Sequence, residues 1–253
     1  MPDELPIPVD VRNPGQFLAC GGLLTLAAAL DENATGRFDG ETFHLASSTD
    51  VWDVLTASEV VMASELQDGP LLLTSGGQPW VRIDWWHEPI MQQLKFKTWS
   101  GGQHAFGFAT GMLALLAASD VTDPFEPRAV SKPKPFYFDS RVSRLISIDL
   151  GFSTDGFTST FSPAVELLAF VGLQRFRPRT IQRRELYGYA TWAEPLPVGL
   201  AAVAATGLTR TLAAADYQFP LRSRTGGKYK AFGPAEPVSY SPTPTTDYGD
   251  LDG

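Results

Sequence analysis

The chain has 253 residues, of which 43% are hydrophobic and 19% charged, and its formal net charge is -8. One large domain or two small ones fit this length. A single cysteine, Cys20, excludes an intramolecular disulfide and indicates a reducing compartment. The apolar run Phe17–Leu30 is too short to span a bilayer, and the acidic start lacks the basic region of a secretory signal. We therefore expect a soluble cytoplasmic protein.

The first half of the chain alternates strands with helices. Alternating apolar positions predict a strand over 5–12, and Asn13 followed by Pro14 signals a helix from Gly15 to about Leu30. This helix is apolar nearly all round, so we expect it to be buried. The other expected elements are a strand-like segment over 36–47, a helix over 47–64 with an apolar face of Val51, Val54, Leu55, Val60 and Val61, strands over 70–75 and 79–87, and a helix over 104–118.

The second half follows a charged, proline-rich connection over 120–135. The expected elements are a hairpin over 135–152, a buried helix over 162–176, a strand over 181–192, a short apolar helix over 198–208, and a hairpin over 217–233 that turns at Gly226-Gly227. The last twenty residues lack a core-forming pattern and predict a disordered tail.

Together these elements predict an α+β fold of two small lobes, each with buried apolar helices packed on mainly antiparallel strands. The acidic N-terminal lobe is placed at 1–127, the basic C-terminal lobe at 128–232, and the acidic Pro/Thr-rich tail at 233–253. The two buried helices share a proline start and the pattern Leu-Ala-x-x-Gly-Leu. We interpret Gly22 and Gly172 as positions where another backbone approaches closely, and the match as a weak sign of duplication.

Charge is distributed unevenly along the chain. Residues 1–127 hold 17 acidic and 5 basic side chains, whereas residues 128–230 hold 7 acidic and 15 basic ones. An acidic protein with such a basic half can present a cationic face to a polyanion. Arginine in particular matches phosphate through its planar fork of donors. The candidate phosphate-contacting residues are Arg175, Arg177, Arg179, Arg183, Arg184, Lys132, Lys134, Arg141, Arg222, Arg224, Lys228 and Lys230.

Aromatic residues follow the arginines on the strand expected at 181–192. On such a strand Arg183, Glu185, Tyr187 and Tyr189 share one face. Tyr187, Tyr189 and Trp192 then have two interpretations, either stacking on unpaired bases or packing in the core. Core packing is the commoner fate of aromatic residues, so the cations support nucleic-acid binding better than the aromatics do.

Catalytic patterns are mostly missing. The stretch "WWHEPIM" begins like a zinc-protease motif, but Met91 holds the second histidine position and Pro89 would break the helix. No second cysteine supports a zinc site, and no glycine-rich stretch ends in Gly-Lys-Ser/Thr. His104 is a candidate general base without a partner recognisable in sequence. We expect no enzymatic activity, no metal and no cofactor.

Four separate blocks carry a family resemblance. "VDVRNPGQFLACGGLLTLA", "FYFDSR", "PAVELLAFVGLQRFRP" and "YATWAEPLPVGLAA" resemble the Csb-type CRISPR-associated subunits of type I-G (formerly I-U) systems, over about Val9 to Phe232. The resemblance implies a non-catalytic subunit of a Cascade-like effector complex, in a place like the large subunit or part of it. It implies contact with CRISPR RNA and target DNA, while a separate helicase-nuclease cuts.

The expected partners are accordingly the other Cascade subunits, CRISPR RNA, target DNA and the recruited helicase-nuclease, with no membrane. Two alternatives remain open. One is a metal-independent ribonuclease that acts on CRISPR RNA through His104 or His87 with a nearby lysine or arginine. The other is a protein-only scaffold whose arginines pair with the acidic residues of a partner.

Overall fold

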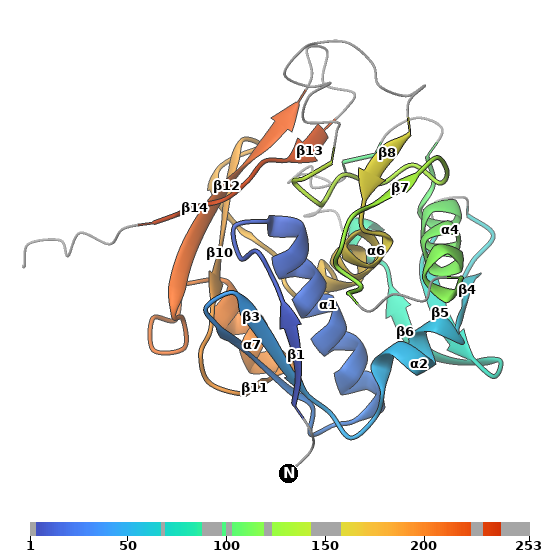
Figure 1. Ribbon diagram of the computed structural model, residues 1–253, viewed down its shortest axis with the longest axis horizontal. Coiled ribbons are helices and arrows are strands. Elements are labelled where there is room, and N and C mark those ends of the chain that lie inside the picture. The colour runs from blue at the N-terminus through green and yellow to red at the C-terminus, as the bar shows by residue number, and fades with distance from the viewer. Residues whose placement is uncertain are drawn as a thin grey trace, which may run out of the picture.

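The structure is a computed structural model, drawn as a ribbon in Figure 1. It describes residues 4–66, 69–87, 98–99, 103–118, 123–142, 158–223 and 230–238. The helices in these ranges are α1 (Pro14–Leu30), α2 (Val51–Thr56), the short 3-10 helix η1 (Trp85–His87), α4 (Ala105–Ala117), α6 (Pro163–Gly172) and α7 (Val198–Ala205). The strands are β1 (Glu4–Pro8), β2 (Thr35–Asp39), β3 (Thr42–Ala46), β4 (Glu59–Met62), β5 (Leu71–Ser75), β6 (Gln78–Ile83), β7 (Arg128–Val130), β8 (Ser159–Phe161), β9 (Arg179–Gln182), β10 (Leu186–Thr191), β11 (Leu196–Pro197), β12 (Ala215–Ser223), β13 (Lys230–Phe232) and β14 (Glu236–Pro237).

The described strands form antiparallel sheets. One sheet has the order β1-β3-β2-β11, a second β4-β5-β6 and a third β13-β12-β10-β9 with β14 beside β12, while β7 pairs with β8. Strand β11 comes from the second half of the chain and pairs with β2, with Leu196 opposite Gly36. Buried helices pack on these sheets in two lobes, which confirms the predicted α+β fold.

Helices α1 and α6 form the centre of the molecule (Figure 1). Asn13 caps α1 by accepting the Gly15 N–H at 3.1 Å, and Ser162 caps α6 by accepting the Val165 N–H at 3.0 Å. Each helix has proline at its first position, where the missing N–H has no intrahelical partner to lose. Every residue of α6 is buried, as is α1 through Ala27, so both helices lie in the interior as predicted.

Aromatic side chains fill the space on both sides of this helix pair. Phe17 of α1 stacks on Tyr189 of β10 with ring centroids 4.1 Å apart. On the other side Phe136 lies between Phe108 and Trp99, with centroid separations of 3.7 and 4.0 Å. These rings belong to one continuous core cluster, so the two lobes share their interior.

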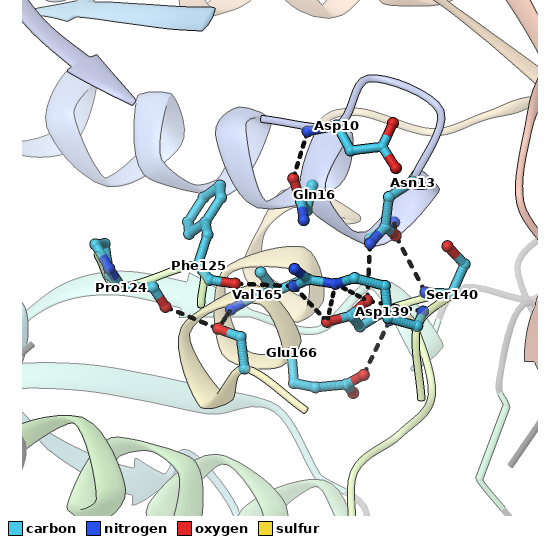
Figure 2. Close-up of polar contacts among 12 residues, drawn as sticks. Asp10, Asn13, Gln16, Pro124, Phe125, Asp139, Ser140, Val165 and Glu166 are labelled. Atoms are coloured by element: carbon cyan, nitrogen blue, oxygen red, sulfur yellow. Dashed lines mark hydrogen bonds and ion pairs between the residues drawn. The ribbon is translucent and has the colours of Figure 1, made fainter. Parts of the chain in front are cut away.

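A buried polar network holds the segment 136–141 across the beginnings of both helices (Figure 2). The two side-chain oxygens of Glu166 on α6 accept the N–H groups of Phe136, Tyr137 and Asp139 at 2.9, 3.0 and 3.0 Å. Asn13 at the start of α1 donates its side-chain N–H to Asp139 at 2.7 Å. Burial raises the pKa of Glu166 to about 8, and the neighbouring Asp139 acts in the same direction while the three N–H donors oppose it. The network thus ties α1, α6 and this segment together.

The helix predicted over 47–64 is wrong beyond Thr56. Asp50 caps α2 by accepting the Trp52 N–H at 2.8 Å, but the helix ends after six residues. The chain then enters β4, where Val60 and Val61 pair with Leu73 and Leu72 of β5. β-Branched valines favour a pleated strand over a helix. Val60 and Val61 therefore belong to a strand and do not continue the helical pattern of Val51, Val54 and Leu55.

The strand predicted over 181–192 is confirmed over Leu186–Thr191 as β10, but its beginning is wrong, because the chain reverses at Arg183–Glu185 between β9 and β10. The hairpin expected over 135–152 shows no strand in its described part, 135–142, and 143–152 lies outside the described residues. The hairpin over 217–233 is confirmed by the pairing of β12 with β13, while its expected Gly226-Gly227 turn lies outside the described residues. The expected disordered tail is wrong in its described part, because Ala235 is buried and β14 pairs with β12. The rest of the tail, from residue 239, lies outside the described residues.

Candidate nucleic-acid interface

The reversal between β9 and β10 presents two arginines to solvent. The Glu185 N–H donates to the Gln182 carbonyl at 3.1 Å, which closes a β-turn with Arg183 and Arg184 at its two central positions. Both side chains are exposed. The prediction that Arg183 shares one strand face with Tyr187 is therefore wrong, because Arg183 lies in the turn before β10 begins.

Strands β12 and β13 bring two further cations to the same end of the sheet. The Leu221 N–H of β12 donates to the Glu185 carbonyl at 2.8 Å, which extends the β10–β12 pairing into the turn. Arg222 follows directly on β12, and Lys230 on β13 lies opposite Ser223. We call this group the turn cluster: Arg183, Arg184, Arg222 and Lys230. Figure 1 shows the end of β12 beside β13, where Arg222 and Lys230 are placed.

Arg184 occupies an unfavourable backbone conformation. Its φ is +70°, in the left-handed region that glycine adopts freely and that other residues rarely enter. A β-turn with positive φ at its third residue normally has glycine there. The Arg184 N–H donates to the Tyr187 hydroxyl oxygen at 3.1 Å, which helps to hold this conformation. Residues held in such conformations cluster at functional sites, which makes Arg184 a candidate functional residue.

The aromatic residues of β10 belong to the core. Tyr187, Tyr189 and Trp192 are at most 1% exposed. The Tyr189 hydroxyl donates to the Val11 carbonyl at 2.7 Å, and the Trp192 Nε1–H donates to the Gly36 carbonyl at 2.6 Å. Of the two interpretations of these aromatics, core packing is therefore the one observed, and they offer no base-stacking surface.

Arg179 and Arg141, two of the sequence-predicted cations, form ion pairs with buried or half-buried aspartates. Arg179 Nη1 lies 3.1 Å from the Asp216 carboxylate and donates to the Thr206 carbonyl at 2.9 Å. Arg141 pairs with the buried Asp139 at 2.8 Å and donates to a carbonyl 2.8 Å away, that of Phe125. These contacts hold loops in place, so both guanidinium groups have a structural role.

The remaining cations are spread over several places. Arg175 is exposed just after α6, and Arg177 is half-buried. Lys132 and Lys134 line a pocket of about 1100 Å³ against α4, together with His104. Arg224 and Lys228 lie outside the described residues. Among the described residues, the structure thus brings four of the predicted cations to the turn cluster, Lys132 and Lys134 to one pocket, and Arg175 and Arg177 to the segment after α6.

Sequence reasoning missed two residues that line a groove with Arg175: Trp80 and Arg82 of β6. They stand two positions apart in a segment that was predicted to be a strand. Residues two apart on a strand share one face, so the sequence could have placed Trp80 and Arg82 side by side. They lie in the acidic half of the chain, away from the clustered arginines.

The described residues contain no group of three or more His, Cys, Asp or Glu side chains placed to hold a metal ion. None of the described helices is long and apolar enough to cross a membrane. No protein-family model, curated protein or solved structure matches the chain. The geometry of the cations and the sequence resemblance are therefore the grounds on which a function is proposed.

Proposed function

We propose that this chain is a cytoplasmic, non-catalytic subunit of a type I-G CRISPR RNA-guided surveillance complex, in a place like the large subunit or part of it. The proposal takes its family from the four resembling sequence blocks. Its partners are the other Cascade subunits, CRISPR RNA, target DNA and the helicase-nuclease that the complex recruits.

The observation that carries the proposal is the turn cluster, above all the exposed Arg184 at φ +70°. In RNA-guided complexes base pairing reads the sequence, and the protein holds the backbone through cationic contacts. A group of guanidinium and ammonium groups at one end of a sheet suits phosphate, because phosphate contacts position a nucleic acid without reading bases. Here two of these cations come from a tight turn and two from a neighbouring hairpin.

Reconstitution tests this proposal. The chain is co-expressed with the remaining type I-G effector subunits and a CRISPR RNA, and the assembly is purified through a tag on another subunit. We expect the chain in the purified complex, and we expect Arg183→Ala with Arg184→Gly to weaken target-DNA binding while the subunit remains in place. Failure of the chain to enter the complex would contradict the assignment. Entry with unchanged DNA binding in the variant would favour the protein-only scaffold.

One observation favours a second candidate, the metal-independent ribonuclease. His104 lines the 1100 Å³ pocket together with Lys132 and Lys134, which supplies the lysine partners absent from the sequence pattern. Imidazole and ammonium groups can act as acid, base and electrostatic stabiliser in RNA cleavage. Incubation of the purified chain with CRISPR RNA in a chelator tests the ribonuclease. Cleavage that is lost in His104→Ala would establish it, and absence of cleavage would contradict it.

A further inference from the structure

A groove of about 400 Å³ lies between the C-terminal half of α1, strand β6 and the segment that follows α6. Trp80 and Arg82 line it from β6, and Gln174 and Arg175 line it from the segment after α6. One tryptophan and two arginines from distant parts of the chain therefore line one hollow. Its volume is within the usual range for sites that hold a small ligand or one group of a larger one.

Strand β6 carries a β-bulge at Trp80. The β5–β6 register shifts between Leu73 and Thr74, so that Trp80 has no residue opposite it on β5. The Trp80 Nε1–H donates to Ser58 Oγ at 3.2 Å, which fixes one edge of the half-buried ring. Bulges often re-aim a side chain next to a functional site. The bulge here places an aromatic ring in the groove instead of leaving it in the regular ladder.

The guanidinium group of Arg82 is bound within the protein only through its Nε atom, as far as the described residues show. Its Nε lies 2.7 Å from the Asp84 carboxylate, and its side chain is 58% exposed. Asp84 is itself held, since its second oxygen accepts the Gln174 side-chain N–H at 2.9 Å. Within the described part of the chain, these contacts engage Nε and leave the two terminal amino groups of Arg82 available for a phosphate. Such a pair of parallel donors matches two phosphate oxygens.

Arg175 supplies the second cation. Its backbone N–H donates to the Gly172 carbonyl at 3.0 Å, which fixes the residue at the end of α6. Its side chain is exposed, and among the described residues its guanidinium makes no hydrogen bond or ion pair. Arg82 and Arg175 line the groove and Asp84 pairs with Arg82 beside it, so two positive charges stand against one negative charge and favour an anion.

We propose that this groove binds one nucleotide of a single-stranded nucleic acid, with the base against Trp80 and the phosphate between Arg82 and Arg175. The inference rests on the proposed function and adds a second contact to it, distinct from the turn cluster. Stacking on an aromatic ring tolerates any base, as a sequence-independent subunit requires. A paired duplex keeps its bases stacked within the helix, so the groove selects a single strand.

Fluorescence anisotropy of the full chain with a labelled 15-nucleotide oligouridylate tests the inference. Trp80→Ala is expected to weaken binding by about 5- to 150-fold, the range found for loss of one base–aromatic stack, and Trp80→Phe to retain most of it. Arg82→Gln with Arg175→Gln is expected to flatten the slope of log K against log salt by about 0.7, the contribution of the one single-strand phosphate that the two arginines share. Arg210→Gln, an exposed arginine outside the groove, is the matched control and should change neither quantity.

Photocrosslinking needs no variant and keeps the test independent of folding. Oligonucleotide carrying 5-bromouridine should crosslink to the peptide that contains Trp80, and a duplex of the same sequence should not. Uridine monophosphate should compete only weakly, because a free nucleotide lacks the turn-cluster contacts of a strand. Equal affinity for the free nucleotide and the strand would overturn the single-strand assignment.

The outcomes separate this inference from the proposed function. If oligouridylate binding falls in Arg183→Ala with Arg184→Gly but is unchanged in Trp80→Ala, and no crosslink maps to Trp80, the groove assignment is wrong while the turn cluster stands. If the chain and its assembled complex bind no nucleic acid, both are wrong. A crosslink at Trp80 together with the loss in Trp80→Ala establishes the groove.

Discussion

Gly22 on α1 and Gly172 on α6 meet at the crossing of their helices. A Cβ atom at Gly22 would lie 1.9 Å from the Leu168 carbonyl oxygen, and a Cβ atom at Gly172 would lie 2.0 Å from the Leu18 carbonyl oxygen. Each leucine stands four residues before the glycine of its own helix, so the contact is the same in both directions. The repeated pattern Leu-Ala-x-x-Gly-Leu therefore packs against itself, with the two backbones in direct contact.

This contact predicts that Gly22→Ala and Gly172→Ala each lower the free energy of unfolding by about 3 kcal/mol or more. The effect lies at the upper end for overpacking, because the added Cβ atom can be accommodated only if the backbone of the facing helix moves. Gly107→Ala on α4 is the matched control, since nothing lies within 4 Å of its Cβ position. That change should raise stability by up to about 1 kcal/mol, as expected for alanine in a helix. Urea denaturation measures all three, and equal stability of the three variants would contradict the close crossing.

Glu166 predicts a pH dependence of stability. Its folded pKa of about 8 lies above the ordinary value of a carboxyl group, so its contribution to stability is present below pH 4 to 5 and is lost as the pH rises towards 8. The stability advantage of the wild type over Glu166→Gln should therefore shrink between pH 5.5 and pH 8.5, by up to about 1.4 kcal/mol per pH unit. Denaturant titrations at several pH values measure this, and an advantage that grows with pH would show that the pKa is lowered instead.

Arg179 and the turn cluster differ in role, and paired measurements separate them. Arg179→Ala breaks a half-buried ion pair with Asp216 and should lower stability by roughly 1 to 3 kcal/mol. It should leave the salt dependence of oligonucleotide binding unchanged, because this guanidinium is already engaged. A flatter salt slope in a folded Arg179→Ala variant would place this arginine on the nucleic acid after all.

Arg184→Gly should improve stability and impair binding together. Glycine relieves the left-handed strain of about 1 to 2 kcal/mol but adds freedom to the unfolded chain, so the expected gain is up to about 1 kcal/mol. The same change removes one phosphate contact. Thermal unfolding and anisotropy on one preparation give both quantities, and a destabilised variant would show that Arg184 serves the fold.

The helices at the centre were predictable because their signals are local. Asn13 with Pro14, a long apolar run and the repeated glycine pattern specify buried helices, and the structure has them at nearly the predicted bounds. The crossing of the two glycines was not predictable in detail, because it depends on how α1 and α6 are oriented in three dimensions.

The site was harder to predict, because its residues are joined by pairing between distant strands. The turn at Arg183–Glu185 has Arg184 at the position where glycine usually marks a turn in a sequence. Without that signal, the pattern over 181–192 predicts one continuous strand. Likewise, the sequence could not separate Arg179, which pairs with Asp216, from Arg183, which lies in solvent. The density of arginines along the sequence identified the segment, but only the tertiary contacts show which of these arginines are paired within the protein and which are exposed.

The central claim is that the turn cluster contacts phosphate, and the salt dependence of nucleic-acid binding tests it most directly. The slope of log K against log salt is measured on the assembled complex for the wild type and for Arg183→Ala with Arg184→Gly. Two lost phosphate contacts should flatten the slope by roughly 1 to 2 and weaken all sequences alike. An unchanged slope in the correctly folded double variant would contradict the phosphate role and leave the protein-only scaffold.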